Sequence, residues 1–399
     1  MQKKKLFSFY KDEKKRNKVF LFTLYTFIVV SLLRIFLCYS FFSISNKLNL
    51  CITFGMAVLG VGLLFFVVPE IIKDTTITIL WLLLVMFFAI SYMSHFSGLE
   101  YISNTITFLS ILSILPYMLL KDKAIKVISF VFLLYACLLV FFANKYGKTQ
   151  NALINLNTND SSFVCFLAEI ILLAIGSSYK KWTFRLPFYI MTTVFLFAQF
   201  QFGGRSTLIA SILFLGYFLF RNFFRKIPPK VVISLVIGLF VLGIIFAFFF
   251  SKILYDSLGK ESVVILGKNI FSGRQRIWSD AFDQMNGHWL LGLGNNLETY
   301  YMQGSLGFAK GSNLHNQPMG YLVCFGSIVF VIYTLLLAWL TAKIGIGKKM
   351  TVAFILCLII NTYFDTSLFS TSRIVYLPIA LLILYYFDKK QKKIDTRAI

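Results

Sequence analysis

The chain has 399 residues, of which 58% are hydrophobic, 18% are aromatic and only 14% are charged, and its mean hydropathy is +0.78. Soluble globular domains carry about 25% charged residues, so this composition excludes an ordinary soluble enzyme and indicates an integral membrane protein. The net charge of +23 does not indicate nucleic-acid binding, because the basic residues gather in short segments between apolar runs.

Twelve apolar runs have about the length that a membrane-spanning helix needs, and none shows the alternation of a barrel strand. They lie near residues 19–42, 48–69, 75–93, 99–120, 124–143, 162–178, 183–202, 205–220, 230–250, 316–340, 350–369 and 372–387. The first run is too long for a signal peptide and lacks a cleavage site, so we expect it to stay as an anchor. The sequence therefore predicts one all-α, polytopic membrane domain over residues 1–399, with about 12 transmembrane helices.

The distribution of Lys and Arg predicts how this bundle is oriented. If the amino terminus is inside, most basic residues fall on the cytoplasmic side, because they concentrate in residues 1–18, in the turns "YKKWTFR" and "RNFFRKIPPK", and in residues 388–399. We expect both termini to be cytoplasmic, with the basic segments near anionic lipid. The six cysteines lie inside apolar runs without C-x-x-C spacing, so neither a disulfide nor a metal site is expected.

Residues 251–315 form the longest break between apolar runs, and the charge count places this loop outside the membrane. Its apolar residues recur at helical spacing at Ile277, Trp278, Ala281, Phe282 and Met285. Ser272 and Gln275 have capping-box spacing, and Asn286-Gly287 is a stop signal. We predict a short amphipathic helix from about 273 to 285 on the outer face of the bundle, followed in "HWLLGLGNN" by turns at Gly292 and Gly294.

Two arginines, Arg274 and Arg276, fall in the first turn of this predicted helix. The helix dipole and the unpaired N–H groups disfavour cations there by up to about 1 kcal/mol each. A bound anion would make this placement of the arginines favourable, since a guanidinium group can donate two parallel hydrogen bonds to phosphate oxygens. The alternative is that Arg276 pairs with Asp280 and Arg274 is solvated.

Arg205 poses a similar question in "QFGGRST". Residues 183–220 must cross the membrane twice, so we expect the turn near Gly203-Gly204 and Arg205 at the outer start of the next helix. Arginine at membrane depth costs a few kcal/mol unless it faces a partner or a cavity, which makes it a functional candidate. The alternative is that Arg205 reaches the outer headgroups.

His315 precedes another helix that enters the membrane, in "NLHNQPM". Pro318 suits the first position of that helix and leaves His315 just outside it. Histidine can accept a proton from a hydroxyl near neutral pH, although a lone loop histidine can equally be structural. All three candidates, Arg205, Arg274 and His315, are predicted at helix starts on the outer side.

Four reserve candidates carry further charges. Arg34 and Glu169 project to the outer half of the membrane, so we expect a structural ion pair, with a polar cavity lining as the alternative. Asp283 and Glu298 are reserve general bases. No P-loop, G-x-G-x-x-G, H-E-x-x-H or D-x-D motif occurs, which argues against a nucleotide donor and a metal.

Together, "GGRSTL", "SGRQRIW", "LLGLGNN" and "LHNQPMGYLVCFGSIVF" resemble the O-antigen ligase and polymerase superfamily over roughly residues 200–330. The family usually has Ser-Arg at the first arginine, where this chain has Gly-Gly-Arg-Ser. The resemblance implies a metal-independent, cofactor-free, inverting glycosyltransferase that uses an undecaprenyl-pyrophosphate-linked glycan at the outer face of the bacterial cytoplasmic membrane.

Carried onto this sequence, the resemblance implies that Arg274 and Arg205 hold the pyrophosphate and that His315 orients or deprotonates the acceptor hydroxyl. Arg276 and Asn316 are additional predicted substrate contacts. The implied partners are the lipid-linked oligosaccharide, membrane lipid, and a chain-length regulator and a flippase of the same pathway.

Three functions remain open at this stage. A polymerase of capsule, exopolysaccharide or O-antigen repeat units is favoured, because a Lys-rich, Phe-rich composition is typical of AT-rich genomes that encode capsule polymerases. A ligase that moves finished polymer to a lipid or protein is the first alternative. A flippase or transporter is the second, although transporters concentrate their polar groups at the membrane midplane.

Overall fold

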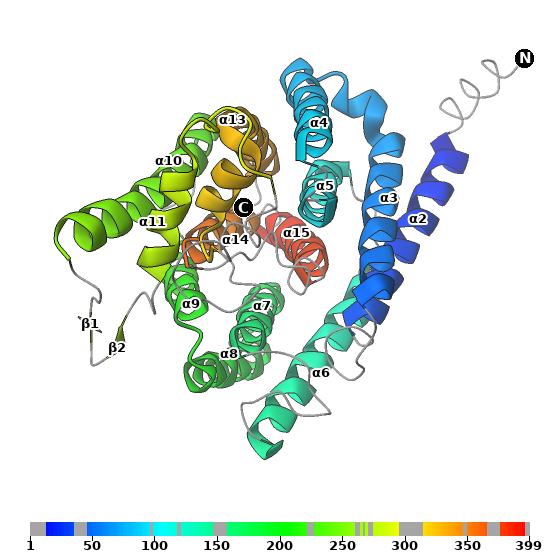
Figure 1. Ribbon diagram of the computed structural model, residues 1–399. Helices are drawn as coiled ribbons and strands as arrows, with labels where there is room; N and C mark the ends of the chain where they lie inside the picture. The colour runs from blue at the N-terminus through cyan, green and yellow to red at the C-terminus, as the bar shows by residue number, and fades with distance from the viewer. Residues whose placement is uncertain are drawn as a thin grey trace, which may run out of the picture.

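The computed structural model of the protein describes residues 13–35, 46–95, 99–117, 121–146, 158–221, 227–259, 264–265, 268–269, 274–294, 314–345, 349–364 and 376–395. Its helices are α2 (Glu13–Arg34), α3 (Asn46–Ile71), α4 (Thr75–His95), α5 (Leu99–Ile114) with the 3-10 turn η2 (Leu115–Tyr117), α6 (Asp122–Tyr146), α7 (Thr158–Ser177), α8 (Trp182–Phe202), α9 (Arg205–Phe220), α10 (Pro229–Phe248) with the π-helix η3 (Phe249–Ser257), α11 (Arg274–Gln284), α13 (Gln317–Gly345), α14 (Lys349–Asn361) and α15 (Tyr376–Asp395). One antiparallel pair of two-residue strands, β1 (Val264–Ile265) and β2 (Lys268–Asn269), completes the described elements. The predicted all-α fold is confirmed (Figure 1).

Seven helices of the described chain are long and apolar enough to cross a membrane: Arg16–Arg34, Cys51–Ile71, Thr75–Ser94, Asp122–Phe142, Asn159–Ser177, Pro229–Ser257 and Gln317–Gly345. Three shorter apolar helices cover Tyr101–Tyr117, Arg205–Phe220 and Lys349–Asn361. These helices make the chain a polytopic membrane protein, whereas the count of twelve spans stays a prediction. The π-helix η3 also carries the ninth run beyond residue 250, where the sequence suggested its end.

Helix α7 lies at the centre of one half of the bundle. Residues 160–178 are all buried, and α6, α8, α9 and α15 pack around them. Helices on the outside instead expose large apolar side chains, among them Phe65, Leu82 and Phe130. In water such a surface would be strongly unfavourable, so these side chains are suited to contact lipid.

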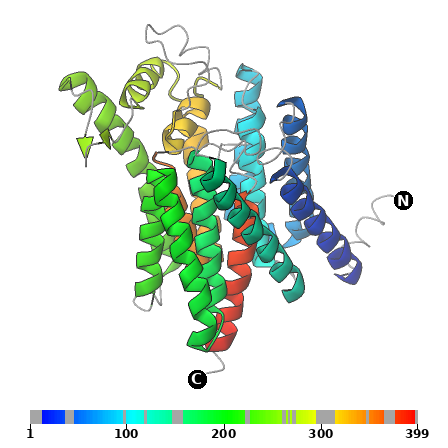
Figure 2. The same ribbon diagram turned by 90° about the horizontal axis from the view of Figure 1, so that it is seen from below.

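The two ends of the bundle differ in chemistry. At one end, ion pairs join helix termini: Lys343 Nζ lies 3.2 Å from Asp74 Oδ2, and Lys390 Nζ lies 3.5 Å from Asp122 Oδ1. The last turn of α15 is at this end, and α11, the end of η3 and the start of α13 are at the other (Figure 2). The described basic helix termini and the elements of the predicted outer loop thus lie at opposite ends, while their orientation in a cell membrane stays a prediction.

Candidate active site

Helix α11 has the boundaries and the buried face that the sequence predicted. Its apolar stripe is buried and packs on η3 and α10, and it comprises Ile277, Trp278, Ala281, Phe282 and Met285. The ring of Phe282 meets that of Phe248 edge to face, with centroids 5.6 Å apart. The predicted stop is confirmed as well, because Gly287 has a φ of 85°, which L side chains rarely adopt.

One hydrogen bond joins α11 to the segment that carries His315. The indole Nε1 of the fully buried Trp278 donates to the backbone oxygen of Leu314 at 2.6 Å. His315 follows with a φ of 50°, a backbone conformation that costs a residue with a Cβ about 1–2 kcal/mol. Backbone strain of this kind persists where the surrounding contacts enforce it, and it often accompanies functional sites.

Asn316 fixes the start of α13. Its Oδ1 accepts a hydrogen bond from the backbone N–H of Met319 at 3.0 Å, and its Nδ2 donates to the backbone oxygen of Gly243 in α10 at 3.2 Å. The side chain is fully buried and caps the helix, so Pro318 is the second helical residue rather than the first. This predicted substrate contact is therefore engaged within the protein, which favours a positioning role for it.

The two arginines at the start of α11 are half-buried. Arg276 Nε donates to the hydroxyl of Tyr255 in η3 at 2.8 Å, and its guanidinium carbon lies 5.9 Å from the centroid of that ring. The ion pairs of the described residues do not include the alternative pairing of Arg276 with Asp280. Burial raises the pKa of the Asp280 carboxyl, Asp283 acts in the same direction, and Arg276 opposes both.

The turn before Arg205 lies where the sequence predicted it. Gly203 ends α8 with a φ of 74°, and Arg205 begins α9 with an exposed side chain. A Cβ on Gly204 would lie 2.2 Å from Ser162 Oγ of α7, so only glycine permits this close approach. The Gly-Gly pair of this chain thus lets α9 begin against α7.

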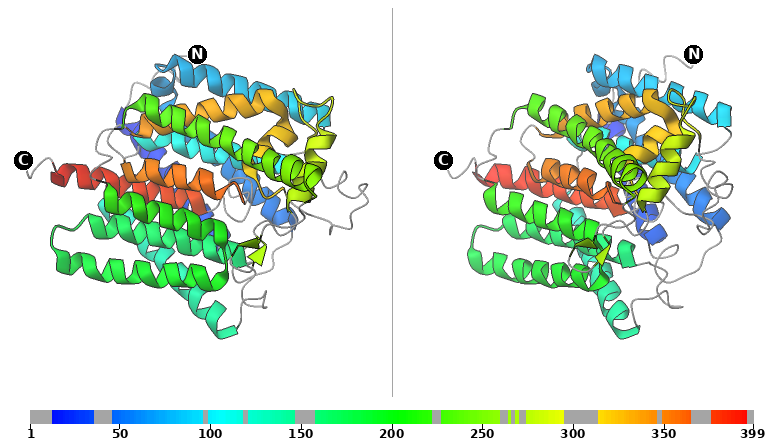
Figure 3. Two further views of the ribbon diagram at one scale, coloured as in Figure 1. Left: turned by 90° about the vertical axis from the view of Figure 1, so that its left-hand side faces the viewer. Right: turned by 60° about the vertical axis from the view of Figure 1, so that its left-hand side comes forward.

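Packing connects the start of α9 to the start of α13. Helix α9 packs against α14, and at the end of α14 the oxygen of Thr362 accepts a hydrogen bond from Gln317 N–H at 2.9 Å. The start of α9, helix α11 and the start of α13 consequently lie at the same end of the bundle (Figure 3). The elements that carry Arg205, Arg274 and His315 thus share one end of the bundle, and the outward position of that end stays a prediction.

The expected ion pair between Arg34 and Glu169 is wrong. Arg34 is buried and donates to Thr53 and, at 3.4 Å, to Met56 Sδ, both on α3. Glu169 instead accepts from Gln199 Nε2 of α8 at 2.7 Å. Arg34 thus has partners on α3, whereas Glu169 has one on α8 and keeps a buried Oε1 without a hydrogen-bond partner among the described residues, which sequence position alone did not reveal.

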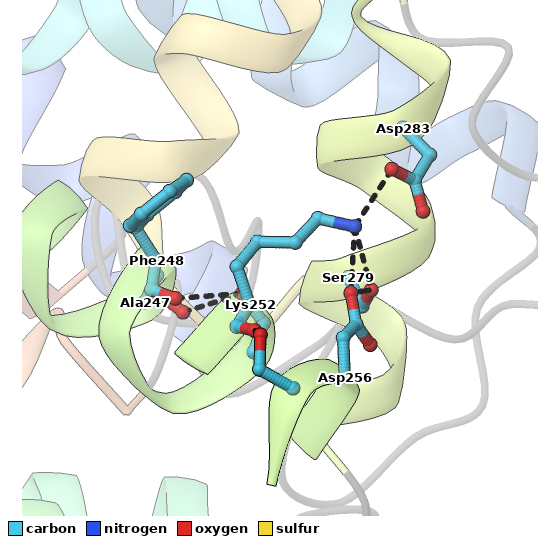
Figure 4. Close-up of polar contacts among 8 residues, drawn as sticks. Ala247, Phe248, Lys252, Asp256, Ser279 and Asp283 are labelled. Atoms are coloured by element: carbon cyan, nitrogen blue, oxygen red, sulfur yellow. Dashed lines mark hydrogen bonds and ion pairs between the residues drawn. The ribbon is translucent and has the colours of Figure 1, made fainter. Parts of the chain in front are cut away.

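The other two reserve candidates have different outcomes. Asp283 lies 2.7 Å from the ammonium of Lys252 in an ion pair, so its carboxylate, although 66% exposed, has a partner within the protein (Figure 4). Glu298 lies outside the described residues.

A break in α13 is a feature that the sequence analysis missed. Gly326, with φ 78° and ψ 175°, interrupts the helix, and the segment after α11 binds the backbone groups that the break leaves free. Leu293 N–H donates to Val323 O at 2.7 Å and Gly294 N–H donates to Cys324 O at 3.0 Å, while Trp289 O accepts from Ser327 N–H at 2.8 Å. We call this set of three hydrogen bonds the Gly326 clasp. The glycines in "LLGLG" and "CFGS" were its only signal in the sequence.

The comparison with protein families bears on this same region. Residues 200–334, from the end of α8 into the second half of α13, match the family model described as O-antigen ligase. This part of the chain is similar to the O-antigen ligase and polymerase superfamily. It contains Arg205, Arg274 and His315, and the sequence-based resemblance is confirmed. Comparison with curated proteins finds no match.

The match to this family points to a role in polysaccharide biosynthesis and to a glycosyltransferase-like activity in a membrane. The family does not distinguish polymerases from ligases.

Proposed function

We propose that this protein is a polysaccharide polymerase of the bacterial cytoplasmic membrane. It would transfer a glycan from undecaprenyl pyrophosphate to a sugar hydroxyl of another lipid-linked repeat unit. The observation that carries the proposal is the gathering of the α9 start, α11 and the α13 start at the end of the bundle opposite the basic helix termini. The segment that matches the O-antigen ligase family covers all three elements.

Arg274 and Arg205 are the proposed ligands of the pyrophosphate. Arg205 is exposed and Arg274 is half-buried, so both side chains have surface that a headgroup at this end of the bundle would contact. During transfer the bond between the anomeric carbon and the phosphate oxygen breaks, and negative charge grows on the departing pyrophosphate. Fixed cations stabilise that charge, and the loss of one comparable donor typically costs about 10²–10³ in rate.

His315 is the proposed base. The acceptor hydroxyl attacks the anomeric carbon from the side opposite the pyrophosphate, which inverts the configuration, and His315 takes the proton of that hydroxyl. The contacts of Leu314 with Trp278 and of Asn316 with Gly243 hold the backbone on both sides of this histidine. This rigidity would keep the imidazole at a fixed distance from the arginines on α11.

Complementation of a deletion strain tests this proposal. Arg274→Ala and His315→Ala should leave single lipid-linked repeat units in place of surface polymer, with each protein at wild-type abundance in membranes. Arg185→Ala is the matched control, because Arg185 is half-buried, as Arg274 is, and lies near the start of α8, at the opposite end of that helix from Arg205. That variant should restore normal polymer.

Other outcomes support the alternatives. Full-length polymer that accumulates on its lipid carrier would indicate a ligase that transfers finished polymer to a lipid or protein acceptor. Normal polymer with both site variants would refute the proposed active site and favour the transporter hypothesis.

A further inference from the structure

We propose that Lys252 is the positioning residue for the arginines of α11, and that it keeps nearby carboxylates from competing with the pyrophosphate for these arginines. This inference rests on the proposed function. Lys252 lies in η3, the π-helix that continues the long apolar helix α10. It is not part of the predicted amphipathic helix, and its role follows only from the contacts between η3 and α11.

All three hydrogen-bonding positions of the Lys252 ammonium are used. Nζ lies 2.8 Å from Asp256 Oδ2, 2.7 Å from Asp283 Oδ1 and 2.9 Å from Ser279 Oγ (Figure 4). Ser279 Oγ in turn donates to Asp256 Oδ2 at 2.5 Å. One lysine therefore joins both carboxylates and a hydroxyl on two helices, and we call these four residues the Lys252 cluster.

The Lys252 cluster binds the face of α11 that also carries Arg276. Arg276, Ser279 and Asp283 follow one another at intervals of three and four residues, so they lie along one side of the helix. Tyr255, on η3, adds its hydrogen bond with Arg276 on the same side. Since α11 has only 11 residues, these contacts and the bond from Trp278 to Leu314 fix both its position and its rotation.

The charges of the cluster matter as much as its geometry. The side chain of Lys252 is 21% exposed and that of Asp256 is 32% exposed, so water screens their attraction only in part, whereas Asp283 is 66% exposed and its attraction to Lys252 is screened more. Without the ammonium, Asp256 and Asp283 would add two uncompensated negative charges to the helix that has to bind pyrophosphate. The half-buried Asp280 lies on the same helix. These carboxylates would repel the pyrophosphate, which is also negatively charged, and they would attract the arginines away from it.

A double-mutant cycle on the purified full-length protein in nanodiscs tests this inference, with undecaprenyl pyrophosphate as the binding probe. Lys252→Met should weaken binding about tenfold, which lies within the coupling range of residues in one ionic network. Asp283→Asn alone should change binding by less than about twofold, because Lys252 keeps Asp256 and Ser279 as partners. In the double variant, removal of the Asp283 carboxylate should recover at least about half of the affinity that Lys252→Met loses, on a logarithmic scale.

A merely structural role for Lys252 predicts a different pattern, in which the two substitutions weaken binding independently. Unchanged binding in Lys252→Met, or a double variant no better than Lys252→Met, would overturn the inference. Lys252→Arg supplies a conservative rescue if Lys252→Met does not fold, and it should bind within about threefold of the wild type. Lys389→Met is the matched control, because Lys389 is exposed at the other end of the bundle.

Failure of the proposed function would look different. If the wild type does not bind undecaprenyl pyrophosphate, or if Arg274→Gln binds it as well as the wild type does, the pyrophosphate site is wrong and the role of Lys252 is refuted with it. If Arg274→Gln loses binding while Lys252→Met keeps it, the site stands and only the positioning role fails.

Discussion

Replacement of Gly326 by alanine should break the Gly326 clasp and destabilise the protein strongly. A Cβ at this position would lie 2.1 Å from Leu290 O, 2.4 Å from Leu290 C and 2.6 Å from Leu291 N. All three atoms are backbone, so no side chain can rotate away to relieve the contact. The segment after α11 would have to move off the break in α13.

Two costs contribute to the magnitude. The backbone conformation of Gly326, φ 78° and ψ 175°, lies in a region that is essentially restricted to glycine, and a residue with a Cβ pays about 1–3 kcal/mol to adopt it. The clasp also loses its three hydrogen bonds to Val323, Cys324 and Ser327, at about 1 kcal/mol each. The expected loss is therefore about 4–6 kcal/mol in the free energy of unfolding.

Thermal unfolding of the detergent-solubilised protein, followed by size-exclusion chromatography after heating, measures this effect. Gly326→Ala should unfold at a clearly lower temperature than the wild type, and Gly292→Ala should do the same, because its Cβ would lie 2.6 Å from Gly326 N. Gly238→Ala is the matched control: nothing lies within 4 Å of its Cβ, and alanine favours a helix over glycine. If Gly326→Ala unfolds at the wild-type temperature, the clasp does not contribute to stability as argued.

Three further predictions concern the elements around the site. Trp278→Phe should keep most of the packing but lose the hydrogen bond to Leu314 O, which costs about 1 kcal/mol. It should clearly lower polymer formation in the complementation assay while it lowers the unfolding temperature only slightly. Gly204→Ala should reduce the yield of folded protein, measured by fluorescence-detected chromatography, and Ser162→Gly in the same chain should restore part of it by removing the clashing Oγ. Because burial raises the folded-state pKa of Asp280, its charge destabilises the fold above that pKa, and this penalty disappears as the pH falls towards the ordinary value of 3.8. Asp280→Asn should therefore be more stable than the wild type at pH 7, with a difference that shrinks as the pH falls; an unchanged difference would contradict the assignment.

The sequence by itself determined the class of the protein and its local elements. Apolar runs indicate membrane helices because lipid leaves the backbone no other partner. The spacing from Ile277 to Met285 predicts α11, because a buried helical face repeats every three to four residues. Gly203 and Gly287 predict chain reversals, since glycine alone adopts their backbone angles without strain. Each of these signals is contained in a few consecutive residues.

Only the tertiary structure decided which residues are partners. Arg34 and Glu169 were expected to pair from their depth in the membrane, yet α3 and α8 supply their partners. The break at Gly326 and the contact of Lys252 with Asp283 likewise join segments whose pairing depends on the packing of whole helices. Helical periodicity reveals which face of a helix is buried, but it carries no information on the helix that covers that face. The arginines and the histidine of the candidate site could therefore be named from the sequence, while the contacts that hold them in place could not.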